Sequence, residues 1–226
     1  MKIIMNNFFR NHRKVLVIFI VVLALIIDQV IKIAVKTTMT LGESVRITDW
    51  FYIDFIENNG MAWGMTFFNK MVLSLFRIAA IALIGYYLYL QIKRKARTRY
   101  IVCLSFILAG AIGNMLDSMF YGLIFNASSP FYVSYLVPFG HGYSSFLLGK
   151  VVDMFYFPLL VTTWPDWIPF VGGQQFIFFS PVFNFADSCV TVGIISLLLF
   201  CRKDLNGFCK LVEDKKQDPK IRKERK

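Results

Sequence analysis

Charged residues, histidine and closely spaced cysteines are all scarce in this sequence. Charged residues make up 17% of the 226 residues and hydrophobic residues 57%, a balance far from that of soluble globular proteins. The two histidines, His12 and His141, are too few for a histidine-based metal site, and we expect neither a metal nor a cofactor. The four cysteines form no C-x-x-C pair, and none lies in a large outer loop, which argues against a membrane thiol oxidoreductase. They are Cys103, Cys189, Cys201 and Cys209.

Four apolar stretches are each close to the ~20 helical residues that cross the hydrocarbon core of a bilayer. They cover residues 15–35, 71–90, 100–124 and 181–201. The first follows a basic stretch but ends in DQVIKIAVKT, without a small-residue cleavage site, so we interpret it as a retained helix. The sequence therefore predicts an all-α integral membrane protein with four transmembrane helices and outer segments at 36–70 and 125–180.

Most basic residues fall in three regions that share one side of the membrane if the chain crosses it four times. Of the 25 Lys and Arg residues, nineteen lie before the first stretch, between the second and third, or after residue 201. The positive-inside rule then places both termini in the cytoplasm. The net charge of +11 is thus a topology signal, and we expect no nucleic acid partner. We predict one membrane-embedded domain, a monomer, over residues 1–201, and a solvated basic tail over 202–226.

Polar side chains inside the apolar stretches lie at a common depth. Counted at ~1.5 Å per residue from the nearest basic anchor, Asp28 lies about 21 Å into the first helix, and Asn114 and Asp187 each about 22 Å into theirs. Three helices therefore place polar groups just below the extracytoplasmic surface. The second helix contributes only Arg77, near its outer end.

The polar residues form pairs with helical spacing, so the members of each pair share one face. Small residues precede the middle pair and would let a neighbouring helix approach closely. One such pair is as compatible with an interhelical hydrogen-bond clamp as with a site, but three coincident pairs favour a site. For the first pair we expect a salt bridge that neutralises itself and orients its helix. The pairs are Asp28 with Lys32, Asn114 with Asp117, and Asn184 with Asp187; the small residues are Ala109, Gly110 and Gly113.

The first outer segment has the alternating pattern of a strand. Its apolar residues occupy every second position, which predicts a short strand or hairpin against the membrane surface, followed by an Asn-Asn-Gly turn. The alternating residues are Val45, Ile47, Phe51, Ile53 and Phe55.

The second outer segment is rich in aromatic residues and proline. Its Trp164, Trp167 and Phe170 are typical of an aromatic belt at a membrane interface, and Asp166 among them is expected to be solvated. In GKVVDMFYF, however, Asp153 interrupts another apolar stretch. Asp153 and Asp187 are thus two outer-leaflet carboxylates in apolar surroundings. Two carboxylates brought together in such surroundings cannot both ionise, so they share a proton, as in aspartic proteases. The ionised member activates water and the protonated member donates to the developing oxyanion.

Five motifs occur in the order found in lipoprotein signal peptidase, also called signal peptidase II. They are DQVIK (28–32), NNGMAWG (58–64), AGAIGNMLD (109–117), VVD (151–153) and FNFAD (183–187), and the chain resembles this family across all four predicted helices. The resemblance implies a multi-pass aspartic endopeptidase of the bacterial inner membrane, with its active site near the periplasmic face. Such an enzyme removes the signal peptide of a prolipoprotein by cleaving before the cysteine that carries a diacylglyceryl group. Its partners would be these prolipoproteins and membrane lipids.

The resemblance also implies roles for particular residues. Asp153 and Asp187 map to the catalytic pair. Other residues would bind the substrate backbone, orient the aspartates or support the site; they are Asn58, Asn114, Asn184, Asp28, Lys32, Gly60 and Asp117. The hairpin and a nearby interfacial helix resemble the cradle that covers the family's active site.

The sequence departs from the family pattern in three places. Ser118 follows Asp117 where the family usually has arginine, and Lys150 is one candidate to supply the missing basic contact. Trp63 replaces phenylalanine in MAWG, and the intervals on either side of Asp153 are longer than in compact members. These inserts are candidates for a lid or a substrate-selective wall.

Three other interpretations remain open from the sequence. A small proton- or ion-coupled transporter would also carry intramembrane ionisable residues, although it should carry them through the full depth of the bilayer. A serine–lysine peptidase could use Ser144 or Ser145 with Lys150. An inactive homologue is the third alternative, suggested by Ser118.

Overall fold

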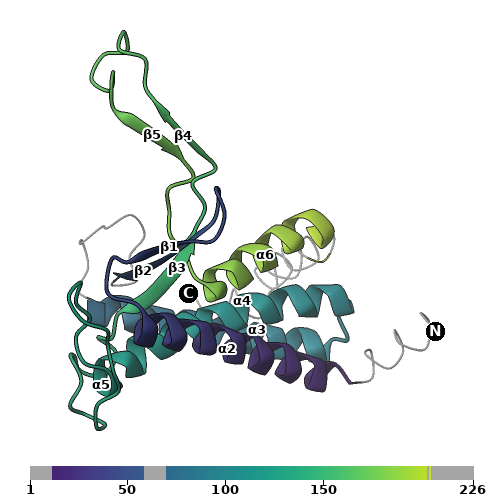
Figure 1. Ribbon diagram of the computed structural model, residues 1–226. Helices are drawn as coiled ribbons and strands as arrows, with labels where there is room; N and C mark the ends of the chain where they lie inside the picture. The colour runs from purple at the N-terminus through teal and green to yellow at the C-terminus, as the bar shows by residue number, and fades with distance from the viewer. Residues whose placement is uncertain (1–11, 59–69, 203, 205–226) are drawn as a thin grey trace, which may run out of the picture.

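The structure is a computed structural model that describes residues 12–58, 70–202 and 204. Four helices lie side by side, a three-stranded sheet covers one end of them, and a two-stranded arm projects from the sheet (Figure 1). The helices are α2 (Arg13–Thr38), α3 (Lys70–Lys93), α4 (Thr98–Leu116, continued by a π-helical turn at Asp117–Tyr121 and by α5 at Gly122–Ile124), and α6 (Phe185–Phe200). The strands are β1 (Ser44–Arg46), β2 (Tyr52–Asn58), β3 (Val151–Tyr156), β4 (Leu160–Thr163) and β5 (Gln175–Phe178).

Within the described residues, three helices are long and apolar enough to cross a membrane, and they match the first three predicted spans. They cover residues 13–38, 70–93 and 98–124. Many of their apolar side chains are exposed, as expected where a helix faces lipid. The chain is therefore a multi-pass membrane protein.

The fourth predicted span begins later than expected. We predicted a helix over 181–201, but α6 begins at Phe185 and has 16 residues. The reason is that Phe183 pairs with Phe155 as an antiparallel bridge, and Asn184 then caps the helix with an extended backbone. Residues 181–184 thus lie beside the sheet.

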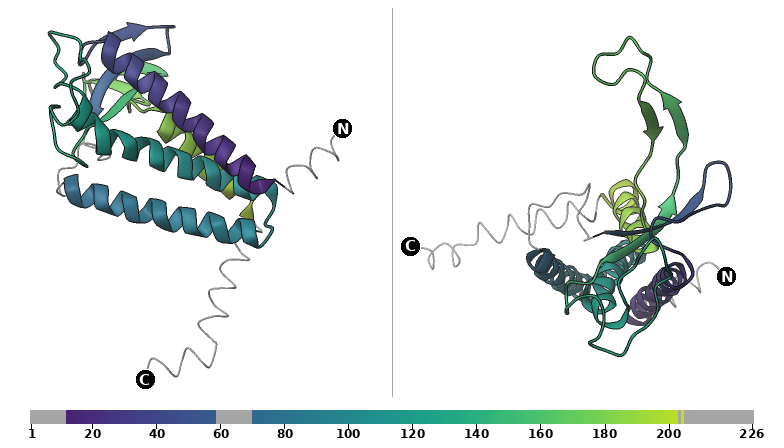
Figure 2. Two further views of the ribbon diagram at one scale, coloured as in Figure 1. Left: turned by 90° about the horizontal axis from the view of Figure 1, so that it is seen from below. Right: turned by 60° about the vertical axis from the view of Figure 1, so that its left-hand side comes forward.

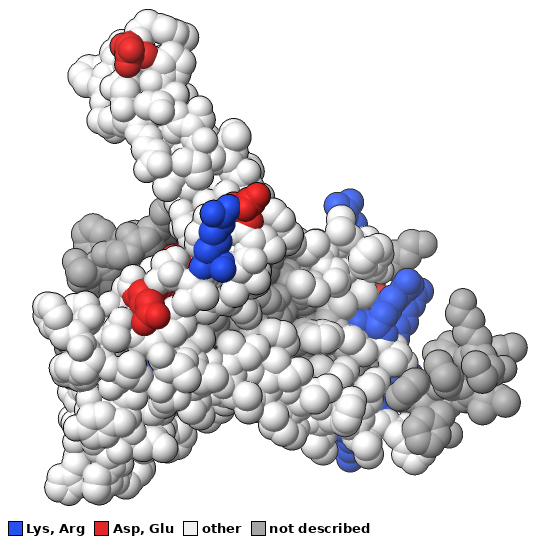
Figure 3. Space-filling view, viewed as in Figure 1, with Lys and Arg blue, Asp and Glu red and all other residues white. Residues whose placement is uncertain are grey.

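Both ends of the bundle have a distinct character. The start of α2, the α3–α4 connection and the end of α6 lie together at one end, which carries most of the basic side chains seen in Figure 3; we call it the basic end. Figure 2 shows the same arrangement from two further sides. The sheet covers the opposite end, here called the sheet end.

The sheet has the order β1-β2-β3, with both pairs antiparallel. The predicted hairpin is confirmed, because β1 and β2 pair antiparallel. Among its alternating apolar residues, Phe55 is fully buried. The third strand, β3, was not predicted. It is almost continuously apolar because it is buried against the helices, a pattern that strand alternation cannot reveal.

The second outer segment contains no interfacial helix, and the interfacial helix that the resemblance implies stays a prediction, because residues 59–69 after the hairpin lie outside the described residues. Residues 125–180 are all described, and they form loops, β3 and the β4–β5 hairpin but no helix. Prolines interrupt this segment at positions 130, 138, 158, 165 and 169, and β-branched and aromatic residues favour strands between them. The fold is therefore a helical membrane bundle with a sheet built onto one end.

Candidate active site

The motif FNFAD forms the beginning of α6. The side-chain oxygen of Asn184 accepts a hydrogen bond from the backbone N–H of Asp187 at 2.9 Å, and the carboxylate of Asp187 accepts one from the N–H of Asn184 at 3.5 Å. This reciprocal capping box explains the three-residue spacing of the pair. Asp187 consequently lies in the first helical turn, where the helix dipole stabilises a negative charge.

Asp153 lies opposite, in the middle of β3. Its strand neighbour on β2 is Ile56, and Asp153 as a whole residue is only 4% exposed. Two amides donate to it: Asn184 Nδ2 to Oδ1 at 2.6 Å, and Asn58 Nδ2 to Oδ2. Burial, and after it the negative charge of Asp187, raises the pKa of Asp153 to about 7.

Two asparagines connect the aspartates. Asn184 Nδ2, which bonds Asp153, also lies 3.0 Å from Asn114 Oδ1, and Asn114 Nδ2 donates to Asp187 Oδ1 at 2.7 Å. The structure thus brings together the two carboxylates that the sequence predicted to meet. Asp153 is buried, whereas Asp187 is partly exposed.

The orientation of each asparagine amide follows from its other partner. Lys32 Nζ, which can only donate, lies 2.9 Å from Asn114 Oδ1, so the amino group of Asn114 must face Asp187. In the same way, the N–H of Asp187 occupies the oxygen of Asn184, so the amino group of Asn184 faces Asp153. Both aspartates therefore receive N–H donors whose direction is fixed by neighbouring groups.

Lys32 is fully buried and joins more partners than predicted. It pairs with Asp28 at 3.0 Å and with Asp117 at 2.8 Å, and it also bonds Asn114. The predicted salt bridge within α2 is present, but the lysine also links α2 to α4. Asp28 has a second role, since its Oδ1 accepts from the N–H of Ala186 at the start of α6.

The small residues of α4 allow this close packing, as predicted. A Cβ at Gly110 would lie 2.2 Å from the carbonyl oxygen of Ala186, and one at Gly113 would lie 2.7 Å from Asp28 Oδ2. The backbone of α4 therefore touches α6 directly at Gly110, one turn before Asn114.

Ser118, the departure from the family pattern, is fully buried in the π-helical turn after α4. Its hydroxyl donates to the carbonyl of Asn114 at 3.2 Å, and its own carbonyl accepts from Gly149 N–H at 2.9 Å. The backbone of Gly149 packs so closely on this turn that a Cβ there would lie 2.4 Å from the Asp117 carbonyl. The position is enclosed by backbone and accommodates a small side chain.

The candidate basic substitute, Lys150, has another partner. Its Nζ lies 3.4 Å from Glu57 Oε2, beside the buried ion pair of Glu57 with Lys36. Burial alone would raise the pKa of Glu57, but Lys36 holds it below its ordinary value. Besides Lys32, Arg77 on α3 is a cation that interacts electrostatically with Asp187, Asp117 and Asp153.

Sequence reasoning missed two contributors to the site. Gln29 donates to Asp117 Oδ1 at 2.9 Å and accepts from the Tyr121 hydroxyl at 3.1 Å. The sequence signal that could have identified it was its position directly after Asp28. The Lys36–Glu57 pair, joined by Ser128, was also missed; its signal was a second lysine four residues after Lys32. Gly60 and Trp63 lie outside the described residues.

The serine–lysine alternative finds no support in this geometry. The Ser144 hydroxyl donates to the carbonyl of Leu148, and Lys150 pairs with Glu57. What the fold does assemble is two aspartates linked through hydrogen-bonded asparagines at one end of a bundle of membrane-spanning helices, with unequal burial of the two carboxyl groups. These features define a class, the aspartic peptidase embedded in a membrane.

Comparison with known proteins identifies the family. The sequence model described as Signal peptidase (SPase) II matches residues 20–202. A lipoprotein signal peptidase of Porphyromonas gingivalis is 51% identical over 183 residues, 80% of each chain, and one of Amoebophilus asiaticus is 35% identical over 187 residues, 80% of this chain and 75% of that one. A solved structure of a bacterial membrane enzyme at 1.9 Å resolution aligns with a TM-score of 0.55 and 26% identity, covering 83% of this chain and 93% of the other. The chain belongs to the signal peptidase II family.

Family membership sets aside the transporter alternative. The position of the polar groups also argues against a transporter, because these groups gather at the sheet end instead of extending through the full depth of the bundle. The chain is a membrane aspartic peptidase.

Proposed function

We propose that this enzyme removes the signal peptide of prolipoproteins by cleaving before a diacylglyceryl-modified cysteine, with Asp153 and Asp187 as its catalytic pair. The observation that carries the assignment is the bridge from Asp153 through Asn184 and Asn114 to Asp187. It holds two carboxyl groups from distant parts of the chain in one polar cluster. Relatives named lipoprotein signal peptidase supply the substrate class.

The unequal surroundings of the two aspartates support different roles for them. Asp187, partly exposed and in the first turn of α6, is the ionised base that takes a proton from the attacking water. Asp153, buried and with a pKa raised to about 7, keeps the shared proton and donates it to the carbonyl oxygen as the tetrahedral intermediate forms. On collapse, the carbonyl is restored, the C–N bond breaks, and the leaving nitrogen takes up a proton from the pair.

Asn58, Asn114 and Asn184 orient the pair, and Asp28, Lys32 and Asp117 hold the asparagines and the start of α6. We propose that Gly60 supports the site from the segment after β2. Arg77 adds a positive charge on the α3 side, which favours one ionised carboxylate in the pair.

We propose further that α6 is the fourth crossing, that the basic end is cytoplasmic, and that the sheet end faces the periplasm at the bacterial inner membrane. At ~1.5 Å per residue, α6 spans about 24 Å, less than the ~30 Å hydrocarbon core. The shortfall is explained if α6 begins below the outer surface, which also places Asp187 near the acyl chains of a lipid-modified substrate.

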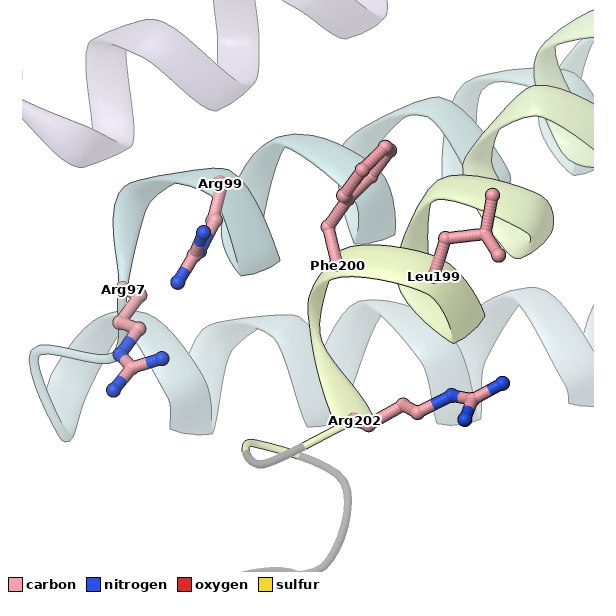
Figure 4. A pocket seen from close by; sticks show the side chains of 5 residues that line it. All are labelled: Arg97, Arg99, Leu199, Phe200 and Arg202. Atoms are coloured by element: carbon pink, nitrogen blue, oxygen red, sulfur yellow. The ribbon is translucent and has the colours of Figure 1, made fainter.

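The hollow in Figure 4 supports this orientation. It lies at the basic end between the start of α4 and the end of α6, far from the aspartates, and is lined by Arg97, Arg99, Arg202, Leu199 and Phe200. Arginines at a helix terminus facing the cytoplasm satisfy the positive-inside rule. The enzyme is then a single membrane-embedded domain, with a basic cytoplasmic tail after residue 201, and we propose that it acts as a monomer surrounded by lipid.

Separate Asp153→Asn and Asp187→Asn substitutions test the catalytic assignment. Each removes a proton-transfer group and should lower the rate of prolipoprotein processing in membranes by at least ~100-fold. Asp166→Asn, which changes an exposed carboxylate on the projecting arm, is the matched control and should leave the rate unchanged.

Insertion and thermal unfolding of the three variants are measured alongside processing. Normal processing by either Asp153→Asn or Asp187→Asn, in a correctly inserted protein, would remove that residue from the catalytic pair.

A further inference from the structure

Residues 157–183 form an arm between β3 and α6. Its two strands pair antiparallel, from Leu160 with Phe178 to Thr163 with Gln175. Figure 1 and the right view of Figure 2 show the arm extending sideways from the bundle, across the helix axes instead of along them. If the helices cross a membrane, such an arm runs along the membrane surface.

The arm has no core of its own. Every residue of β4 is exposed, Trp167 is 80% exposed and Phe170 is 99% exposed. Asp166 is the sole charged residue between positions 157 and 183, and in Figure 3 the arm is uncharged except near its end. Its other exposed large apolar residues are Leu159, Leu160, Val161, Trp164, Phe178 and Phe179.

These exposures require a covering surface. An isolated two-stranded hairpin is at best marginally stable in water, and a contiguous apolar surface without charges marks a protein or membrane contact. The hydrocarbon core is excluded, because both outer edges of the hairpin carry backbone groups that would stay unpaired there. The lipid head-group layer satisfies both demands, since it accepts apolar side chains and still supplies water to the strand edges.

The root of the arm fixes its level relative to the aspartates. Phe157 stacks on Phe51 with ring centroids 4.7 Å apart and on Phe183 at 5.7 Å. Phe155 and Phe183 exchange backbone hydrogen bonds, Phe155 N–H to the Phe183 carbonyl at 2.7 Å and Phe183 N–H to the Phe155 carbonyl at 3.0 Å. Phe155 lies two residues after Asp153, and Phe183 directly precedes Asn184, so the arm and the two aspartates are held on the same piece of backbone structure.

We propose that the arm lies in the head-group layer of the outer leaflet and holds the aspartate pair at that depth. Lipid is favoured over a protein partner for two reasons. The arm offers almost no charge for a specific protein contact, and the helix that follows it, α6, also exposes apolar side chains, among them Val192 and Ile195. The proposal rests on the orientation given above, with the sheet end outward.

Tryptophan fluorescence tests the location of the arm without using activity. The full-length enzyme is placed in vesicles of phosphatidylethanolamine and phosphatidylglycerol with acyl chains brominated near the head group. The signal of Trp164 and Trp167 is the difference between this enzyme and its Trp164→Phe/Trp167→Phe variant. We expect brominated lipid to quench this difference signal and aqueous iodide to leave most of it. Quenching by iodide but not by brominated lipid would place the arm in water and overturn the proposal in favour of a soluble partner.

Processing measured in two environments tests the effect on the site. The Trp167→Ser/Phe170→Ser variant should process a lipid-modified substrate roughly tenfold more slowly in vesicles, because the arm loses two membrane-contacting side chains, yet at the normal rate in detergent micelles. Thr163→Ser/Gln175→Ser, on the same hairpin, is the control and should be unaffected in both. Equal rates of the tip variant and the unaltered enzyme in vesicles would contradict the depth role, whereas equal losses in both environments would indicate a folding defect and contradict it as well. Neither result depends on whether Asp153 and Asp187 are catalytic.

Discussion

At the scale of single residues, the site is organised by which atoms can donate a hydrogen bond. Lys32 has only donors, so it turns the oxygen of Asn114 inward, and the backbone N–H of Asp187 does the same to Asn184. The two amides therefore present N–H groups to the aspartates. Burial then distinguishes the two aspartates, since Asp153 is buried and Asp187 is partly exposed.

This difference predicts how activity depends on pH. The pKa of Asp153 is raised to about 7, so its protonated fraction falls as the pH rises through that value, and the rate should fall with it. Measurement of kcat/KM against pH, in vesicles of constant composition, should show a basic limb near pH 7. A rate that stays constant well above this pH would show that Asp153 does not act as the proton donor.

The aspartates themselves were predictable from the sequence, because carboxylates interrupt apolar runs in only a few places. Their partners were less so. Gln29 and Glu57 look like ordinary polar residues in a list of amino acids, and only the packing of α2 against α4 and β2 shows that they are joined to the site. Lys150 was a reasonable substitute for the missing arginine, but the nearby carboxylate of Glu57 pairs with it instead.

At the scale of elements, the contact between α4 and α6 decides whether the site forms. Gly110 lets the two backbones touch, and Asn114 reaches Asp187 one turn further along α4. The stretch of small residues predicted close packing, although it could not show which helix is the partner.

Substitution of Gly110 tests this contact. Gly110→Ala places a Cβ 2.2 Å from the Ala186 carbonyl, so the helices must separate, which should cost about 1–3 kcal/mol in the free energy of unfolding and weaken processing. Gly85→Ala on α3 is the control, because a Cβ there meets nothing within 4 Å, and it should be neutral or slightly stabilising. Thermal unfolding in detergent and processing in membranes measure both effects. Equal behaviour of the two variants would show that the α4–α6 contact tolerates separation.

Helices and strands differed in how well they could be predicted. Long apolar runs identify α2, α3 and the helical stretch 98–124 that begins with α4, each to within three residues at either end. The start of α6 depends on a capping box and on a bridge to β3, which is a long-range pairing that no local pattern encodes. The β4–β5 hairpin was missed because exposed apolar strands violate the alternation by which strands in soluble proteins are detected.

At the scale of the whole molecule, one end of the bundle is basic and the other carries the sheet and the aspartates. This polarity makes a topological prediction. The test starts from a Cys209→Ser variant, because the cysteines that remain are buried. In this background, Thr48→Cys on the β1–β2 turn should react with a membrane-impermeant thiol reagent added to intact cells. Arg94→Cys, in the α3–α4 connection, should react only after the membrane is permeabilised. The opposite pattern would reverse the proposed orientation.

The first helix shows how far the enzyme is from a catalytic head on replaceable anchors. From the sequence, α2 resembles a simple membrane tether with one ion pair. In the structure its Asp28 holds the start of α6, its Lys32 sets the amide of Asn114, and its Lys36 pairs with the sheet through Glu57. A generic hydrophobic helix grafted in its place would still insert into the bilayer, but it would leave three separate segments without the neighbour that aligns them. In this protein, insertion in the membrane and assembly of the candidate site are properties of the same helix.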